Sequence, residues 1–223
     1  MFNINDEAFN PAVFEAIVKK KQGYVRMKRA FDIALTIPLI IFLSPLFLVT
    51  ALLIKMTSRG PVLFLQKRIG YLGREFTIYK FRSMEIAYCQ NGICHKKEEN
   101  PDKLLSPKIS EEDKLTPIGN FLRKSSIDEL PQLLNVLKGE MSLVGPRPLA
   151  TYMVLPFENI NKIRSLAMPG ITGLWQVKAR DNKTNVFQKI PWDIEYLKTM
   201  NLWTDIKILL LTLPVVVRQK GAG

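Results

Sequence analysis

Apolar residues concentrate in one stretch of the chain, from Ala30 to Ile54, which reads AFDIALTIPLIIFLSPLFLVTALLI. Asp32, a few hydroxyl-bearing side chains and two prolines interrupt the run, and it is long enough to cross the hydrocarbon layer of a bilayer. The run is too long for a cleaved signal peptide, and the TSRGPV segment after it offers no small-x-small cleavage site. The pattern therefore predicts a membrane helix over residues 28–56.

Basic residues flank this run on both sides, so charge assigns neither end to the outside. Six lysines and arginines lie within residues 19–29, and four more lie within residues 55–68. Within the run, Pro45 lacks a backbone donor and clashes with the preceding turn, so the helix bends or breaks at Ser44 and Pro45, where the serine hydroxyl is available to the freed carbonyls. We predict a re-entrant helix-break-helix that enters and leaves on one face. A spanning helix with a proline kink is the alternative.

Shorter patterns surround the membrane segment. Residues 1–27 combine apolar positions with a KKK triplet, which is typical of a short interfacial helix or a mobile arm. After the membrane segment, residues 62–65 and 76–81 predict two strands of a hairpin joined by a turn at Gly70 and Gly73. Residues from about 86 to 112 are polar and predict a loop insertion.

The second half of the chain alternates helical and extended segments. Thr116 and Pro117 predict the start of a helix that reaches Arg123, and a further helix is predicted from near Asp128 to Lys138, stopped at Gly139. The remaining predictions, in chain order, are the extended segment MSLVGPRP, a helix over residues 156–168, a PGITGLWQV turn that feeds a strand, and helices over residues 192–197 and from 204 onward.

These elements together predict an α/β fold that is mainly α with a small β-hairpin. The last helix contains IKILLLTLPVVV, which is so apolar that it packs in the core, dimerises or lies in the membrane interface. The expected domains are an N-terminal arm or interfacial helix over residues 1–27, the re-entrant membrane helix over residues 28–56, and a cytosolic domain with amphipathic interfacial helices over residues 57–223.

The net charge of the chain narrows the classes of molecule that it is expected to bind. Lysines and arginines number 32 against 20 acids, a net charge of +12, which favours nucleic acid, an acidic membrane face or a phosphorylated substrate. Basic and aromatic residues rarely alternate outside YKF, which argues against nucleic acid. Cys89 and Cys94 have no further cysteines around them, which favours a reducing compartment, and with His95 they offer too few ligands for zinc. The sequence contains no phosphate-binding glycine loop and no motif of a histidine-dependent hydrolase.

Two acids, Asp128 and Glu129, stand side by side in RKSSIDELPQ, residues 123–132. One interpretation is a capping box, with Ser126 as the N-cap and Glu129 reaching back to it. Pro131 argues against it, because a proline in the fifth helical position lacks a donor and clashes with the preceding turn. A helix that begins at Asp128 or Glu129 places both acids at its positive end, where Asp128 stays ionised, phosphate is attracted and Glu129 can turn toward a metal. The local pattern alone leaves both interpretations open.

Basic residues are spaced so that they could flank an anion beside these acids. Lys80 and Arg82 lie two apart on a predicted strand, in KFRSM, and so project from one face, while Arg123 ends the helix before the acidic pair. Arg147 lies between two prolines in GPRP, which fix the backbone and lower the entropy lost when a guanidinium binds a phosphate through two hydrogen bonds. Single lysines and arginines are usually solvated surface charges, so the prediction depends on their joint pattern.

Six motifs occur in an order that resembles one protein family. They are the KRAFD opening at residues 28–32, the Ser-Pro-interrupted membrane helix, KFRSM, SIDELPQLLNVLKGEMSLVGPRP, PGITGLWQV and the D-x-x-Y of Asp193 to Tyr196. From about residue 26 to the C-terminus the chain resembles the bacterial sugar transferases, the monotopic phosphoglycosyl transferases that begin glycoconjugate assembly on polyprenol phosphate. It is similar to the short catalytic-core form of this family.

The resemblance implies transfer of sugar 1-phosphate from a UDP-sugar to polyprenol (undecaprenyl) phosphate, with release of UMP. In that family the aspartate of the acidic pair is the nucleophile and the glutamate serves Mg²⁺, and these roles carry over to Asp128 and Glu129. The expected phosphate- or substrate-binding residues are Lys80, Arg82, Arg123, Arg147, Gln176, Arg180 and Asp193. The implied setting is the bacterial cytoplasmic membrane, with bilayer lipids as partners, a monotopic topology and a site that faces the cytoplasm; a homodimer is left open.

Two positions depart from the family pattern. Met168 stands where members usually have a basic residue before Pro-Gly, and Ala179 stands where Gly is common before Arg180. These departures concern nucleotide or sugar contacts and leave the expected chemistry unchanged. The alternative to an enzyme is a non-catalytic scaffold at the membrane surface, which explains neither the paired acids nor an arginine between two prolines.

Overall fold

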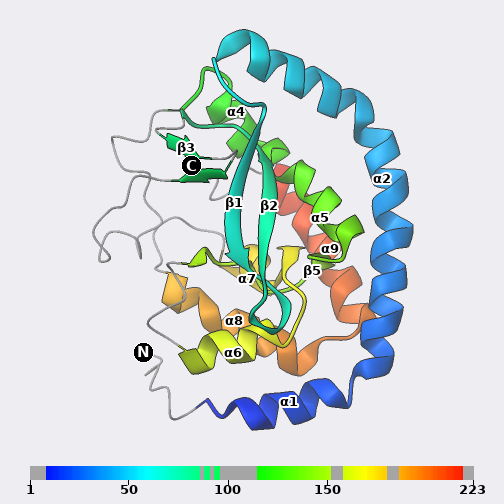
Figure 1. Cartoon of the computed structure of the whole chain (residues 1–223). Coiled ribbons are helices and arrows are strands. Elements are labelled where there is room, and N and C mark those ends of the chain that lie inside the picture. The colour runs from blue at the N-terminus through cyan, green and yellow to red at the C-terminus, as the bar shows by residue number, and fades with distance from the viewer. Residues whose placement is uncertain are drawn as a thin grey trace.

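One long helix lies along the side of the molecule (Figure 1). In the computed structural model this helix, α2, covers Gln22–Thr57. The structure describes residues 9–85, 88–90, 93–95, 115–151, 158–179 and 186–217. Within these ranges α2 is the one helix that is long and apolar enough to cross a bilayer, judged by length and composition.

α2 continues through Pro45 without interruption, so the break predicted at Ser44 and Pro45 is absent. Pro45 cannot donate to the carbonyl of Ile41, four residues earlier. The Ser44 hydroxyl donates to that carbonyl instead, with 2.8 Å between Oγ and O. Figure 1 shows that α2 runs up one side and then turns across the top of the molecule, so the helix is bent and not broken. It also begins at Gln22, earlier than residue 28.

The predicted hairpin is confirmed. Strands β1 (Leu63–Ile69) and β2 (Glu75–Phe81) pair antiparallel along their whole length. The turn between them contains a 3-10 turn, η2 (Tyr71–Gly73), in which Gly73 has a φ of 75°, a conformation that glycine adopts without strain. Phe81, at the end of the hairpin, packs against Ile54 of α2.

A second antiparallel pair lies within the predicted loop insertion. It consists of β3 (Tyr88–Gln90) and β4 (Ile93–His95). The remainder of the insertion, through residue 112, lies outside the described residues.

Three consecutive elements follow the insertion: α4 (Gly119–Lys124), η3 (Ile127–Gln132) and α5 (Leu133–Lys138). Gly139 ends α5 with a φ of 80°, as predicted. α4 begins later than predicted, because the Thr116 side chain does not cap it; the Thr116 carbonyl accepts the N–H of Gly119 at 2.8 Å instead. The acidic pair therefore lies on a 3-10 turn between two short helices.

The last third of the chain surrounds a small parallel sheet with helices. β5 (Ser142–Val144) pairs with β6 (Gly170–Thr172). The helices described here are α6 (Glu158–Ser165), α7 (Leu174–Lys178), α8 (Val186–Thr199) and α9 (Leu202–Val217). α6, α8 and α9 confirm the predicted helices, but α7 replaces the strand expected at LWQV. Leu174 and Val177, three residues apart, both pack against the core, which is the spacing of a helix.

The expected N-terminal arm is a docked helix in its described part. α1 (Pro11–Lys19) begins after Asn10, whose side chain accepts the N–H of Ala12. Phe14 is buried in the main core, where α1 contacts α6 and α8. Lys21 then donates to the carbonyls of Lys198 (2.7 Å) and Met200 (3.1 Å) at the end of α8. This segment is thus part of the folded body.

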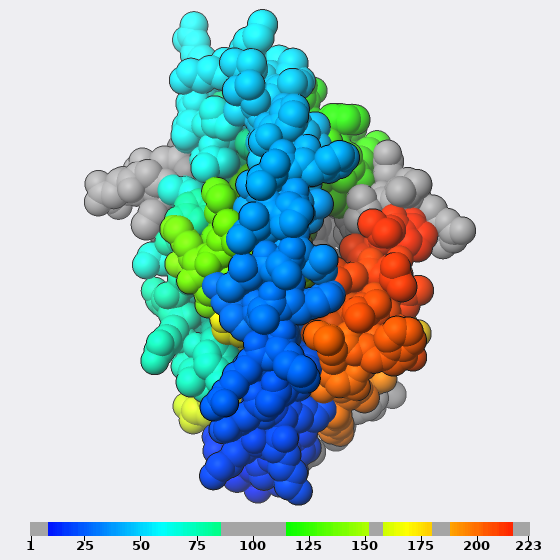
Figure 2. All heavy atoms as spheres, turned by 90° about the vertical axis from the view of Figure 1, so that its right-hand side faces the viewer, coloured from blue at the N-terminus to red at the C-terminus, as the bar shows by residue number. Residues whose placement is uncertain are grey.

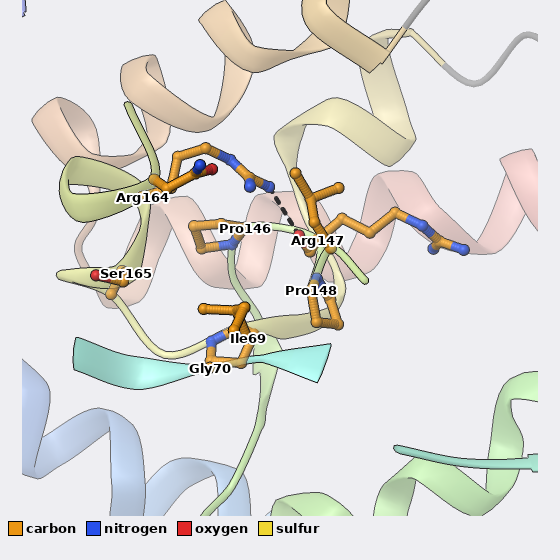
Figure 3. Close-up of a pocket in the computed structure, with 11 residues that line it drawn as sticks. Ile69, Gly70, Pro146, Arg147, Pro148, Arg164 and Ser165 are labelled. Carbon is orange, nitrogen blue, oxygen red and sulfur yellow. Dashed lines mark hydrogen bonds between the residues drawn. The ribbon is translucent and has the colours of Figure 1, made fainter. Parts of the chain in front are cut away.

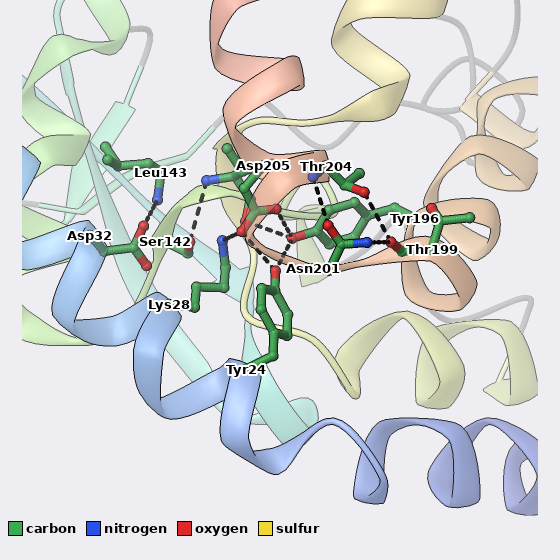
Figure 4. Close-up of polar contacts among 11 residues, drawn as sticks. Tyr24, Lys28, Asp32, Ser142, Leu143, Tyr196, Thr199, Asn201, Thr204 and Asp205 are labelled. Atoms are coloured by element: carbon green, nitrogen blue, oxygen red, sulfur yellow. Dashed lines mark hydrogen bonds and ion pairs between the residues drawn. The ribbon is translucent and has the colours of Figure 1, made fainter.

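A buried polar network fastens the first turns of α2 to α9 (Figure 4). The Nζ of Lys28 lies 2.7 Å from Oδ2 of Asp205, and both side chains are buried. Asp205 also accepts hydrogen bonds from Tyr24 (2.7 Å) and Tyr196 (2.8 Å). Asp32 accepts a backbone N–H from β5 at 3.2 Å. The polar residues at the base of α2 therefore hold it to α8, α9 and β5.

The other end of α2 is held by the same body. Ile54 is fully buried in a cluster with Phe81 and Leu122. Just beyond the helix, Ser58 and Arg59 present backbone carbonyls that accept hydrogen bonds from a guanidinium described below. The middle of α2 faces outward instead, with Phe42 80% exposed, and Figure 2 shows it crossing the front of the molecule beside α9.

Candidate active site

The acidic pair lies on η3, and its backbone is set by Ser126. Ser126 adopts a left-handed conformation with a φ of 57°, makes no side-chain cap, and accepts the N–H of Glu129 through its carbonyl at 3.2 Å. The capping box considered from the sequence is therefore not formed. Instead, Oε1 of Glu129 accepts hydrogen bonds from Lys80 at 2.7 Å and from Arg147 at 2.9 Å.

Strand β2 brings Lys80 to the acids, and Asn135 fixes the strand against α5. The Nδ2 of Asn135 donates to the carbonyl of Thr77 at 2.7 Å, and its Oδ1 accepts the N–H of Tyr79 at 3.1 Å. Asn135 is fully buried, so water does not compete for these two hydrogen bonds. Sequence reasoning missed this residue; the available signal was an amide between the apolar positions of a short helix.

The segment from Gly145 to Pro148 carries Arg147 to the opposite side of Glu129. Gly145 packs so closely on the β6 end of the sheet that a Cβ there would lie 2.1 Å from the carbonyl oxygen of Met168, so no larger residue fits. The Arg147 carbonyl accepts a hydrogen bond at 2.7 Å from Arg164 on α6. Figure 3 shows the Arg147 side chain extending away from Arg164. At its far end the guanidinium donates to Glu129.

The two neighbouring acids have opposite pKa shifts. Burial and the adjacent charge of Glu129 raise the pKa of Asp128 to about 6, while Lys80, Arg123 and Arg147 oppose the rise. Burial also acts to raise the pKa of Glu129, but the charges and hydrogen bonds of Arg147 and Lys80 win and hold it well below its usual range. Glu129 is therefore a fixed negative charge, whereas Asp128 changes charge just below neutral pH.

The structure brings together four of the predicted residues around Asp128: Glu129, Lys80, Arg147 and Arg123. Arg123 lowers the pKa of Asp128 and directs its guanidinium toward the sulfur of Met84, 3.1 Å away. This guanidinium has no carboxylate partner among the described residues, so its charge is available to a further anion.

Arg82 does not join this group, contrary to the expected strand alternation with Lys80. β2 ends at Phe81, so the alternation does not extend to residue 82. The Arg82 side chain is buried and donates to the carbonyl and hydroxyl of Ser58, at 2.9 and 2.7 Å, and to the carbonyl of Arg59. The Arg82 side chain therefore binds the backbone that follows the C-terminal end of α2.

The other predicted substrate-binding residues lie farther along the fold. Asp193 is fully buried and accepts two hydrogen bonds from Arg164 at its Oδ2. Gln176, on α7, donates to the carbonyl of Ile171 at 3.4 Å, and its Oε1 is buried with no partner in the described part of the chain. Arg180 lies outside the described residues.

Two hollows meet at Arg147. The smaller one, about 200 Å³, is lined by Arg68, Ile78, Lys80, Glu129, Gln132, Arg147 and Pro148. The larger one, about 310 Å³, lies between the GPRP segment, the end of β1 and α6, and Figure 3 shows its lining. Arg147 and Pro148 therefore line both the hollow that contains Glu129 and the larger hollow beside α6.

The donor set around the acids fits Mg²⁺ brought in with a phosphorylated substrate. The described residues contain no cluster of three metal-ligating side chains. Mg²⁺ in phosphate-transferring sites uses only one or two carboxylates and completes its shell with water and substrate phosphate oxygens. Oε1 of Glu129 receives both cations, so its second oxygen and the carboxylate of Asp128 could supply those one or two ligands.

A model of the bacterial sugar transferase family matches residues 23–219. The chain is 44% identical over 166 residues to "Galactosyl transferase CpsE" of Streptococcus agalactiae, covering 73% of this chain and 36% of the relative. It is 41% identical over 203 residues to the UDP-glucose:undecaprenyl-phosphate glucose-1-phosphate transferase of Caulobacter vibrioides, covering 87% and 71%. It is 35% identical over 202 residues to the exopolysaccharide production protein ExoY of Sinorhizobium fredii, covering 87% of each.

The chain spans well under half the length of several curated relatives that it matches. The family model nevertheless covers nearly all of the residues that build the site, from the base of α2 to α9. The protein belongs to the bacterial sugar transferase family.

Proposed function

We propose that this protein transfers a sugar 1-phosphate from a UDP-sugar to a polyprenol phosphate, such as undecaprenyl phosphate, and releases UMP. The observation that carries the proposal is that the two adjacent acids differ in their partners and in their pKa. Glu129 binds Lys80 and Arg147, whereas Asp128 sits beside the same cations with a pKa near 6 and accepts no hydrogen bond from the described residues. An ionised carboxylate in that setting is a nucleophile for phosphorus.

The reaction has two displacements. A carboxylate oxygen of Asp128 attacks the sugar-bearing phosphorus of the donor, the bond to the bridging oxygen breaks, and UMP leaves with the electron pair. A phosphate oxygen of the lipid then attacks the same phosphorus, the bond to Asp128 breaks, and the carboxylate is restored. Each step keeps the sugar-oxygen bond intact, so the products are UMP and a polyprenol diphosphate sugar.

Cations make this attack feasible. A carboxylate that approaches a diphosphate is repelled unless positive charge offsets the repulsion where it builds. Lys80 and Arg147 stand on the Glu129 side, and Arg123 stands close enough to lower the pKa of Asp128. Mg²⁺, when bound at Glu129, would supply further positive charge to the diphosphate.

We propose a monotopic, re-entrant placement of α2 in the bacterial cytoplasmic membrane, with the site facing the cytoplasm. The support is that both ends of the helix bind one folded body: Lys28 pairs with Asp205 at the base, and Arg82 binds Ser58 at the far end. If α2 crossed the bilayer between those points, the body would have to lie on both sides of the membrane. The exposed apolar middle of α2 can enter the lipid while both ends stay on the same face.

The sugar is proposed at the level of a simple hexose. The LWQV motif resembles that of family members that use simple hexoses, and relatives reported above are named for glucose and galactose. We place the product at the first membrane step of a surface glycan. A panel of UDP-sugars, scored by UMP release with undecaprenyl phosphate present, identifies the donor.

The decisive experiment uses the donor without the lipid acceptor. Purified full-length protein in detergent is mixed with the UDP-sugar that supports UMP release and Mg²⁺, quenched, digested and examined by mass spectrometry. We expect one added sugar phosphate on the peptide that contains Asp128, and no such adduct in Asp128→Asn. Glu75→Gln, an acid-to-amide change at the exposed start of β2, is the matched control and should form the adduct.

The outcomes separate the alternatives. Turnover without any adduct on Asp128 would contradict the covalent mechanism. Unchanged UMP release in Asp128→Asn would exclude this residue as the nucleophile. Complete absence of UMP release from the unmodified protein with every donor would favour a non-catalytic membrane scaffold.

A further inference from the structure

Arg164 joins three segments of the fold through one guanidinium. Its Nε and one terminal nitrogen donate to Oδ2 of Asp193 at 2.9 and 2.7 Å. The same terminal nitrogen donates to the carbonyl of Arg147 at 2.7 Å (Figure 3). Arg164 is 6% exposed and Asp193 is fully buried. α6, α8 and the GPRP segment are therefore tied together away from bulk water.

The fold places this pair behind Arg147. Pro146 and Pro148 restrict the backbone on both sides of Arg147, so its carbonyl hydrogen bond fixes much of the remaining freedom. The Arg147 side chain extends the other way and reaches Oε1 of Glu129 at 2.9 Å. The backbone of Arg147 is thus anchored at one end of the residue while its charge acts at the other.

The opposite charges of Arg164 and Asp193 allow a second arginine to lie close to Arg147. Burial raises the pKa of Asp193, whereas Arg164 and the backbone N–H of Arg147 oppose the rise, so this carboxyl faces both arginines. A buried guanidinium next to Arg147 would repel it unless an acid balanced the charge. Asp193 supplies that balance with 2.7 Å separating its Oδ2 from Arg164.

We propose that Arg164 and Asp193 are a positioning pair that fixes the backbone of Arg147 and, through it, the grip of Arg147 on Glu129 and on the donor diphosphate. The inference rests on the proposed transferase function and assigns Asp193 a role different from direct substrate binding. Neither residue touches the reacting atoms; both act through the placement of Arg147. Small displacements of such a group have large effects, because a shift of about 1 Å can lower a rate about 100-fold.

The test compares substitutions of two buried aspartates that form ion pairs with different residues. Asp193→Asn loosens the Arg147 anchor, whereas Asp205→Asn weakens the Lys28 pair, which contacts the base of α2 and not Arg147. Both aspartates are fully buried, so a loss of stability alone is common to the two variants. UMP release is measured for full-length protein in one detergent, with kcat and KM for the UDP-sugar determined across pH.

We expect Asp193→Asn to raise KM for the UDP-sugar by about tenfold or more, since it disturbs a charge-assisted phosphate contact. Asp205→Asn should lower the melting temperature but leave KM unchanged. Equal KM values in the two variants would overturn the proposal.

Arg164→Lys provides a second variant if Asp193→Asn does not fold. Lysine keeps the positive charge but lacks the planar fork that contacts both the Asp193 carboxylate and the Arg147 carbonyl. It should show the same rise in KM, and a wild-type KM would contradict the inference. Loss of UMP release in the unmodified protein would defeat the proposed function; an active wild type with unaltered variants would defeat this inference alone.

Discussion

Lys80 and Glu129 form a 2.7 Å ion pair that joins strand β2 to the 3-10 turn carrying the acids. Because the glutamate takes up this cation and Arg147, the neighbouring Asp128 remains close to positive charge without being neutralised by a direct ion pair in the described part of the chain. Two consecutive acids therefore have opposite pKa shifts, and the one with the raised pKa is the proposed nucleophile.

The raised pKa predicts how activity depends on pH. Asp128 has a pKa of about 6, so it is ionised above that value and protonated below it. Only the ionised form attacks phosphorus, so kcat/KM should rise with pH through about 6 and level off above about 7. A pH series of UMP release at fixed Mg²⁺ and ionic strength measures this limb. A rate that is flat between pH 5 and 7 would contradict the assignment.

The same shift predicts that the nucleophile lowers stability. The unfolded chain releases this proton near pH 3.8 and the folded protein near 6, so the folded state loses stability as pH rises between these values. At pH 8 the cost is on the order of 3 kcal/mol. Asp128→Asn should therefore abolish UMP release yet raise the melting temperature at pH 8, with a smaller gain at pH 5. A variant that melts earlier at pH 8 would argue for a structural acid.

Glu129 is expected to serve the metal. Glu129→Gln removes the charge that Lys80 and Arg147 bind and one proposed Mg²⁺ ligand. We expect UMP release to fall by about 100-fold or more and to lose its dependence on Mg²⁺ concentration, while UDP binding in EDTA is not weakened. Titration of activity with Mg²⁺ and calorimetry with UDP measure both quantities. Wild-type Mg²⁺ dependence in Glu129→Gln, with Glu75→Gln as control, would rule out the metal role.

The re-entrant placement of α2 has its own test. Cysteines are introduced at Lys20, Phe42 and Arg59 in a background with Cys89 and Cys94 replaced by serine. A membrane-impermeant maleimide should label the sites at 20 and 59 from the same side of sealed vesicles, and lipid should protect position 42, which is 80% exposed in the protein itself. Labelling of the two ends from opposite sides would establish a spanning helix.

The buried pair at the base of α2 predicts a large stability effect. Lys28→Met leaves Asp205 fully buried without its cation, which should cost about 3–5 kcal/mol of unfolding free energy. The control, Lys67→Met, removes an exposed partner 3.9 Å from Glu75 and should cost less than about 1 kcal/mol. Thermal melts in detergent compare the two. Equal losses would show that the network in Figure 4 does not hold the helix.

Local signals in the sequence predicted most of the elements. The turn at Gly70 and Gly73 predicted the hairpin, Gly139 ended α5, and the predicted helices over residues 156–168, over 192–197 and from 204 onward coincide with parts of α6, α8 and α9. LWQV was predicted wrongly because a short apolar run does not distinguish a strand from a helix. The break at Ser44 was wrong because the serine hydroxyl satisfies the carbonyl that Pro45 frees.

The site was predictable where local sequence sets its geometry. Asp128 and Glu129 adjoin in the chain, and the structure brings Lys80 and Arg147 to them as the motifs implied. The partners of Arg82 depend on where α2 ends, which local sequence does not specify.

Arg164 was missed although a signal existed. It follows Ile163 and lies four residues after Ile160, and both isoleucines are fully buried. A charged residue beside the apolar face of a helix is buried only when paired, so this position called for an acidic partner. The identity of that partner, Asp193 on another helix, is a long-range fact that spacing does not supply.

Lys28 and Arg82 hold the two ends of α2 to one folded body, so the helix cannot move independently of that body. In the proposed re-entrant placement, the depth of α2 in the lipid also sets the height of Asp128 above the hydrocarbon, because the helix and Asp128 belong to one folded body. The length and bend of a single helix would thus fix the depth at which the proposed lipid phosphate substrate meets Asp128.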